Sequence, residues 1–131
     1  MLEVGNSYSE TRVASEEIIE EIAKISGDVN PIHLDETYAK DSVFGKRVAH
    51  ALFCQNIISM IIGNFLPGKG AILVSQTFKY HCPVYLGDKI EATVVVKEVL
   101  PRGKYVLDTV CRNQSKEIVL TGVSIVKWQN K

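Results

Sequence analysis

The sequence has no excess of charge of either sign. Fifteen basic and fifteen acidic residues among 131 cancel to a formal net charge of zero. The basic residues are scattered, and their one adjacent pair, Lys46-Arg47, is interpreted as part of a solvated loop. Without a cationic patch, nothing favours binding to nucleic acid or to an anionic membrane surface.

Cysteine is scarce, and the sequence contains no C-x-x-C pair. Cys54, Cys82 and Cys111 are far apart, so neither a disulfide framework nor a zinc site is expected. Cys54 and Cys111 stand among apolar residues, which is typical of small core residues. Free thiols suit a reducing compartment, and we expect the protein to be cytoplasmic.

Signals for export and for membrane insertion are also missing. The first residues contain no basic stretch leading into an apolar one, so no signal peptide is expected. The most apolar segment, residues 48–66, is interrupted by histidine, glutamine, asparagine and serine. It therefore predicts a buried helix and not a membrane span.

Apolar periodicity gives the order of the elements. Ser15 is a good helix N-cap, Gly27 a good helix end, and the apolar residues between them recur at helical spacing. Asp35 can cap a short helix through Ala39. The pattern predicts helices over 15–26 and 49–65, and strands over 2–12, 71–80, 89–100, 104–112 and 117–128.

The 49–65 helix is apolar on nearly all sides, so we expect it to be buried on most of them. In the 71–80 strand, Ile72, Val74, Phe78 and Tyr80 should share one face. Such a helix must be covered by a sheet. We therefore predict a single α+β domain over residues 1–131, with a curved antiparallel sheet wrapped around a long central helix.

A polar pair, Asp28 and His33, lies in a proline-containing segment between helical patterns. An aspartate and an imidazole beside one cavity can position a water and exchange protons with it, as addition of water to an enoyl thioester requires. Backbone N–H groups at the start of the 49–65 helix, including that of Ala51, could stabilise the resulting enolate oxygen. Taken alone, Asp28 can equally be a turn residue and His33 a surface histidine.

A longer motif surrounds this pair. The run Ser26-Gly27-Asp28-Val29-Asn30-Pro31-Ile32-His33 resembles the signature of the MaoC-like, (R)-specific enoyl-CoA hydratases, which are hot-dog-fold proteins. The resemblance continues through residues 44–70, and also includes Phe78, Pro83-Val84 and Gly87-Asp88. It covers most of the chain.

The resemblance implies that Asp28 and His33 are the catalytic pair, and that they act on a water in a tunnel near a dimer interface. It also implies that Asn30 supports the loop, that residue 51 contacts the substrate thioester, and that Ser59 lines the acyl site. A Ser59 hydroxyl bonded back to the preceding turn is the alternative. The expected partners are an acyl-CoA or acyl-carrier-protein thioester and a second copy of the chain, as a homodimer or higher homo-oligomer, with no cofactor and no metal.

One departure stands out. The family usually has His-Gly where this chain has His50-Ala51, so the added methyl could hinder close approach of the thioester. His50 itself is interpreted as a structural residue at the helix start. Lys69 and Arg47 are candidates for contacts with coenzyme A phosphates.

Two other functions compete with hydration. A hot-dog acyl thioesterase, or a carrier-protein dehydratase, commonly has a catalytic acid on the long helix, but residues 49–65 contain no Asp or Glu. A non-catalytic module that binds acyl thioesters is expected to lack the Asp/His pair, which is present here. Both observations favour the hydratase.

Overall fold

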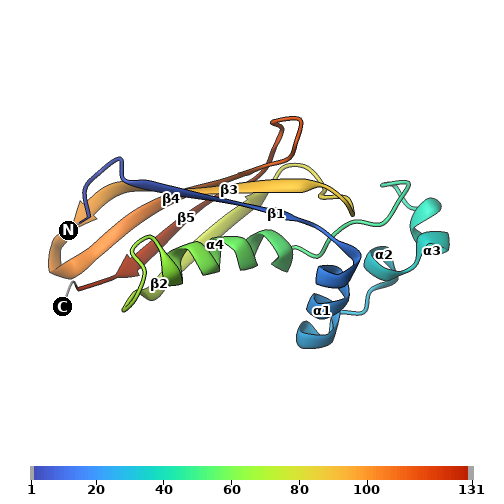
Figure 1. The fold of residues 1–131 in the computed structure, drawn as a ribbon, viewed down its shortest axis with the longest axis horizontal. Coiled ribbons are helices and arrows are strands. Elements are labelled where there is room, and N and C mark those ends of the chain that lie inside the picture. The colour runs from blue at the N-terminus through green and yellow to red at the C-terminus, as the bar shows by residue number, and fades with distance from the viewer. Residues whose placement is uncertain (1, 130–131) are drawn as a thin grey trace.

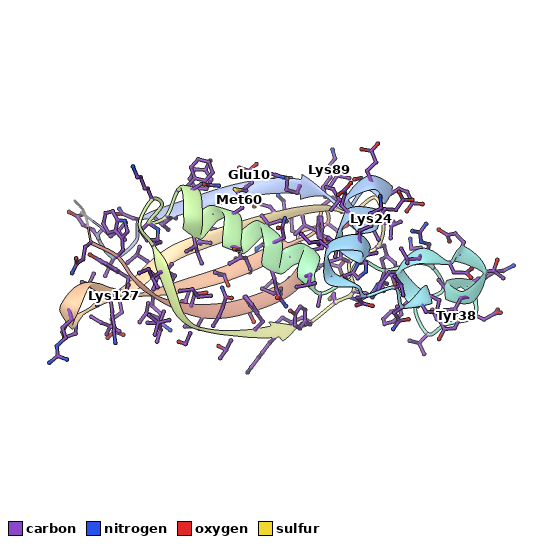
Figure 2. All side chains as sticks on the ribbon, turned by 90° about the horizontal axis from the view of Figure 1, so that it is seen from below. Glu10, Lys24, Tyr38, Met60, Lys89 and Lys127 are labelled. Atoms are coloured by element: carbon purple, nitrogen blue, oxygen red, sulfur yellow. The ribbon has the colours of Figure 1, made fainter. Side chains whose placement is uncertain are left out.

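The computed structural model describes residues 2–129, in which five antiparallel strands form one sheet in the order β1-β3-β4-β5-β2. The strands are β1 (Ser7–Val13), β2 (Ile72–Tyr80), β3 (Lys89–Leu100), β4 (Lys104–Arg112) and β5 (Ile118–Lys127). Helix α4 (Leu52–Asn64) lies along the inner face of this curved sheet (Figure 1, Figure 2). The predicted α+β hot-dog architecture is confirmed.

Three shorter helices gather at one end of the sheet, beyond the N-terminus of α4 (Figure 1). They are α1 (Glu16–Ser26), α2 (Pro31–Leu34) and α3 (Glu36–Lys40). The predicted caps are present: Ser15 Oγ accepts a hydrogen bond from the Ile18 N–H, and Gly27 ends α1 with a left-handed φ of 77°. Asp35 caps α3. None of the helices in residues 2–129 combines the length and the apolar character needed to cross a lipid bilayer.

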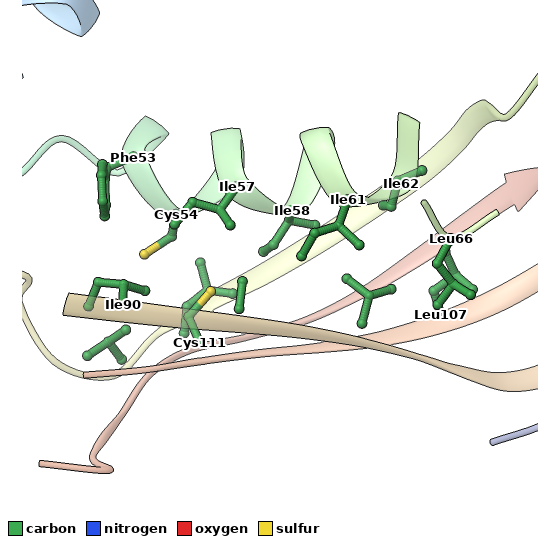
Figure 3. Close-up of a cluster of buried hydrophobic side chains, with 14 of the residues drawn as sticks. Phe53, Cys54, Ile57, Ile58, Ile61, Ile62, Leu66, Ile90, Leu107 and Cys111 are labelled. Atoms are coloured by element: carbon green, nitrogen blue, oxygen red, sulfur yellow. The ribbon is translucent and has the colours of Figure 1, made fainter. Parts of the chain in front are cut away.

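The core lies between α4 and the sheet. One side of the helix packs against inward-facing residues of β3, β4 and β5 (Figure 3). The buried helix residues are Phe53, Cys54, Ile57, Ile58, Ile61 and Ile62. Cys54 and Cys111 are both buried, as predicted. The adjacent Cys54 thiol, together with burial, raises the pKa of Cys111, so Cys111 remains a protonated core residue.

The long helix is less buried than we predicted from the sequence. It begins at Leu52, not at residue 49, and a second side is open and carries Leu52, Asn56 and Ser59. This second side is open because the sheet of this chain covers only one side of the helix.

The prediction of which β2 residues share one face was also wrong for the first half of the strand. The pairing of β2 with β5 shifts between Leu73 and Ser75, so Val74 occupies a β-bulge. Directly paired residues share a face of the sheet, and Leu73 pairs with the buried Val126. The extra residue thus reverses the inward and outward alternation of side chains before the bulge. Leu73 lies on the inner face, where Ile72 and Val74 were predicted to lie.

Candidate active site

The segment that connects α1 to α2 is ordered by its own side chains. Asn30 is the N-cap of α2, where its Oδ1 accepts a hydrogen bond of 3.1 Å from the Ile32 N–H. The Asn30 N–H donates to Asp28 Oδ1 at 3.1 Å. Pro31 starts a helix here and does not simply break one, because the first helical position needs no N–H donor. The short helix α2 was not predicted. These bonds hold Asp28 and Asn30 in a defined orientation, and the supporting role of Asn30 in catalysis stays a prediction.

Asp28 and His33 face each other across a gap of 3.7 Å between Oδ2 and Nε2. The Asp28 side chain is half exposed, and that of His33 is 11% exposed. His33 Nδ1 lies 2.7 Å from the Val48 carbonyl oxygen. A carbonyl oxygen only accepts, so Nδ1 carries the hydrogen and donates it. The neutral ring therefore presents the lone pair of Nε2 toward Asp28.

His50 holds the two predicted catalytic residues together. Its ring stacks on the His33 ring, with centroids 3.9 Å apart and an interplanar angle of 27°. Its Nε2–H donates to the Asp28 carbonyl oxygen at 3.0 Å. The residue is 3% exposed, which agrees with its predicted structural role. The ligand-type atoms of Asp28, His33 and His50 lie within 4.8 Å of one another, a spacing that could also hold a metal ion.

Arg47 is the residue that sequence reasoning placed wrongly. It is 7% exposed, so it belongs neither to a solvated loop nor to a contact with coenzyme A phosphates. Its Nε–H donates to the His33 carbonyl oxygen at 2.7 Å, and its terminal nitrogens donate to both carboxylate oxygens of Glu16 at 2.9 and 2.6 Å. The hydrogen bond from Arg47 lowers the pKa of Glu16, and the same bond raises the pKa of Arg47. Arg47 thus ties α2 to the first turn of α1.

Ala51 is the N-cap of α4 and precedes the first helical turn in which it was predicted. Its φ of −53° and ψ of −33° are ordinary right-handed values, so alanine fits here without backbone strain. It lines a cavity of about 350 Å³, which we call the first cavity. Other residues lining the first cavity include His50, Cys54, Tyr80 and Val84.

Ser59 lies farther along α4, in a different hollow. This second cavity, of about 340 Å³, is lined by Gln55, Asn56, Ser59 and Gln76 among others. The two cavities have no lining residue in common. The structure therefore brings Asp28, Asn30 and His33 together next to His50, the residue before Ala51, and it places Ser59 two helical turns from Ala51.

Comparison with known proteins shows the family of the chain. Residues 3–117 match the family model described as the MaoC like domain. The 3-hydroxybutyryl-CoA dehydratase of Methylorubrum extorquens is 38% identical, over 99% of this chain and 83% of its own length. The (R)-specific enoyl-CoA hydratase of Rhodospirillum rubrum is also 38% identical, over 93% of this chain and 85% of its own length.

The fold has well-matched solved counterparts. The unliganded R-hydratase PhaJ1 from Pseudomonas aeruginosa superposes with a TM-score of 0.95 and 35% identity, covering 99% of this chain and 84% of its own. The matched region includes the segment that carries Asp28 and His33. By family model, sequence identity and fold, the chain belongs to the MaoC-like domain family.

Proposed function

We propose that this chain catalyses the reversible hydration of trans-2-enoyl-CoA thioesters to (R)-3-hydroxyacyl-CoA, with Asp28 and His33 as the catalytic pair. The observation that carries the proposal is that two acceptors, a carboxylate and an imidazole lone pair, face each other 3.7 Å apart. The imidazole contacts Val48 and His50, which line the first cavity. Two relatives are named for the same chemistry on coenzyme A thioesters, one for each direction of the reaction.

The gap between Asp28 and His33 suits one water. It exceeds a direct hydrogen bond, and a water beside it lies within reach of both groups. Because both groups accept, the water donates one hydrogen to the Asp28 carboxylate and the other to His33 Nε2. Its oxygen lone pairs then point outward, toward the β-carbon of a bound enoyl thioester.

The reaction follows from that arrangement. As the water oxygen bonds the β-carbon, one of its hydrogens passes to the catalytic pair, and the π electrons move to form the thioester enolate. The N–H of Ala51 and the positive end of the α4 dipole stabilise the enolate oxygen. The α-carbon then takes the proton back from the pair, which completes the addition of one water. Dehydration is the reverse.

Stereochemistry follows from the same geometry. The two groups lie on one short segment and share one water, so oxygen and proton reach one face of the double bond. Addition should be syn. The names of the R-specific relatives support the (R) sense of the product, which the residue spacing does not define.

The test is hydration of crotonyl-CoA in D₂O, followed by the loss of enoyl absorbance and by chiral analysis of the product. We expect turnover, syn addition of deuterium and (R)-3-hydroxybutyryl-CoA. Predominant (S) product or anti addition would show that the catalytic pair is misassigned. Thioester cleavage with release of free coenzyme A would favour the thioesterase, and binding without any turnover would favour the non-catalytic module.

The proposed active form is a homodimer. The outer edge of β2 is unpaired in the described chain, and its first residues, Ile72, Leu73 and Val74, are apolar and between 50% and 62% exposed. An exposed apolar edge strand is a liability unless another strand or element covers it. The expected mass in multi-angle light scattering is that of a dimer or larger, and a monodisperse monomer at micromolar concentration would contradict this part of the proposal. The free thiols support the proposed cytoplasmic location.

A further inference from the structure

A hydrogen bond crosses the space between α4 and β2, with one cavity on each side of it. Gln55 Nε2 donates to the phenolic oxygen of Tyr80. Tyr80 lines the first cavity, together with His50 and Ala51, while Gln55 lines the second cavity, together with Ser59. The Gln55–Tyr80 bond therefore stands at the boundary between the two cavities.

The boundary lies at a defined place along the helix. Ala51, Gln55 and Ser59 follow one another at intervals of four residues, so they share a side of the helix and are each about 6 Å apart along its axis. On β2, Tyr80 and Gln76 share the inner face, since they pair with Leu120 and Ser124. The bond from Gln55 to Tyr80 thus crosses the line from Ala51 to Ser59 at its midpoint.

We propose that the Gln55–Tyr80 bond is a barrier that restricts the enzyme to short acyl chains, of about four carbons. The proposal rests on the proposed function, in which the thioester oxygen lies at the Ala51 N–H. The three C–C bonds of a four-carbon acyl group, about 1.5 Å each, span at most about 4.5 Å. That is shorter than the distance of about 6 Å from Ala51 to Gln55. An eight-carbon chain, with seven such bonds, extends past the barrier.

Passing the barrier has an energetic cost. An apolar chain that enters the second cavity must separate the Gln55 amide from the Tyr80 hydroxyl. Tyr80 is 51% exposed in the described chain, so water can pair with the separated groups on their open side. The cost arises where the methylene carbons of the longer chain exclude that water. A four-carbon chain avoids this loss, whereas an eight-carbon chain does not.

The test compares trans-2-octenoyl-CoA with crotonyl-CoA in the wild type and in Gln55→Ala, Tyr80→Phe and the double variant. In the wild type, kcat/KM should be far higher for crotonyl-CoA. Gln55→Ala should raise the ratio of octenoyl to crotonyl kcat/KM by at least about tenfold, which is the lower range for discrimination by an apolar pocket. Tyr80→Phe should raise the same ratio by less, because the ring remains. The double variant should fall short of the product of the two effects, because both changes break one bond.

Gln114→Ala is the matched control. Gln114 also uses its side-chain amide in a bond to another side chain, that of Asp88, but it lies outside both cavities. Its loss should leave the chain-length ratio unchanged. Melting temperatures of all variants verify that the fold is intact.

Binding of saturated butyryl-CoA and octanoyl-CoA, measured by calorimetry, reports the same selectivity without any chemistry. A wild type that accepts both chain lengths equally would contradict the barrier proposal. Unchanged octenoyl-to-crotonyl ratios in both Gln55→Ala and Tyr80→Phe would also contradict it. If the wild type hydrates neither enoyl thioester while the binding ratio still shifts in the variants, the proposed function fails and the barrier stands.

Discussion

Arg47 is a positioning residue whose role can be separated from stability. Replacing it by lysine keeps the positive charge but removes the Nε–H, which donates to the His33 carbonyl oxygen at 2.7 Å. The lysine ammonium can still approach Glu16. The carbonyl of His33, however, loses the donor that holds α2 in place, so the imidazole should move relative to Asp28.

The size of the effect follows from that one bond. A hydrogen bond from a charged donor contributes about 1.5–3 kcal/mol to stability. At about 4 °C per kcal/mol for a domain of this size, the melting temperature of Arg47→Lys should fall by roughly 6–12 °C. Displacement of a catalytic group by about 1 Å can lower the rate by about 10²-fold. We therefore expect kcat to fall by about 10–100-fold, with KM little changed.

The assay is steady-state hydration of crotonyl-CoA at a temperature well below every melting transition. Lys46→Ala is the control for loss of a neighbouring positive charge, because Lys46 is exposed beside the buried Arg47. Glu16→Gln is a second control, since it weakens the ion pair but leaves the bond to His33. Both controls should retain kcat. A wild-type kcat in Arg47→Lys, with only the melting temperature lowered, would refute the positioning role.

Two further predictions concern the catalytic pair and acid stability. Asp28→Asn and His33→Ala should each lower kcat by about 10²–10⁴-fold while the fold stays intact. The double variant should be little worse, because both groups hold one water. Near wild-type turnover in either folded variant would contradict the assignment of the catalytic pair. The hydrogen bond from Arg47 lowers the pKa of Glu16 from its ordinary value of 4.5, so its stabilising effect is present above that pH and is lost as the pH falls through the lower, folded-state pKa. Urea unfolding between pH 6 and pH 3 should therefore show a smaller acid loss in Glu16→Gln than in the wild type, and identical acid profiles would contradict this.

Local signals explain what could be predicted from the sequence. The caps Ser15 and Gly27 act within one helical turn of their own helix, so their residue types were enough to bound α1. Asp28 and His33 lie on one short segment, and their proximity needs only that this segment turns. The motif around them was sufficient to identify the candidate site.

Long-range pairing explains what was missed. Glu16 lies 31 residues before Arg47, so no local pattern indicated that this arginine in a glycine-containing loop would be buried. The stacking of His50 on His33 likewise depends on how α4 approaches α2. The bulge at Val74 is a change of register between two strands, and alternation within one strand does not report it. The open side of α4 could have been predicted from the sequence, because the polar residues Gln55 and Ser59 recur at helical spacing.

The strand order has a consequence for how the molecule folds. β3, β4 and β5 are consecutive and pair through short turns, so this meander closes small loops. The edge strand β1 pairs with β3 across the four helices and β2, and the edge strand β2 pairs with β5 across β3 and β4. The closing of these longer loops has a larger entropic cost. The meander should therefore form first and exchange its amide hydrogens last. The catalytic segment connects β1 to α4, so the enzyme acquires its active site only when the late edges are in place.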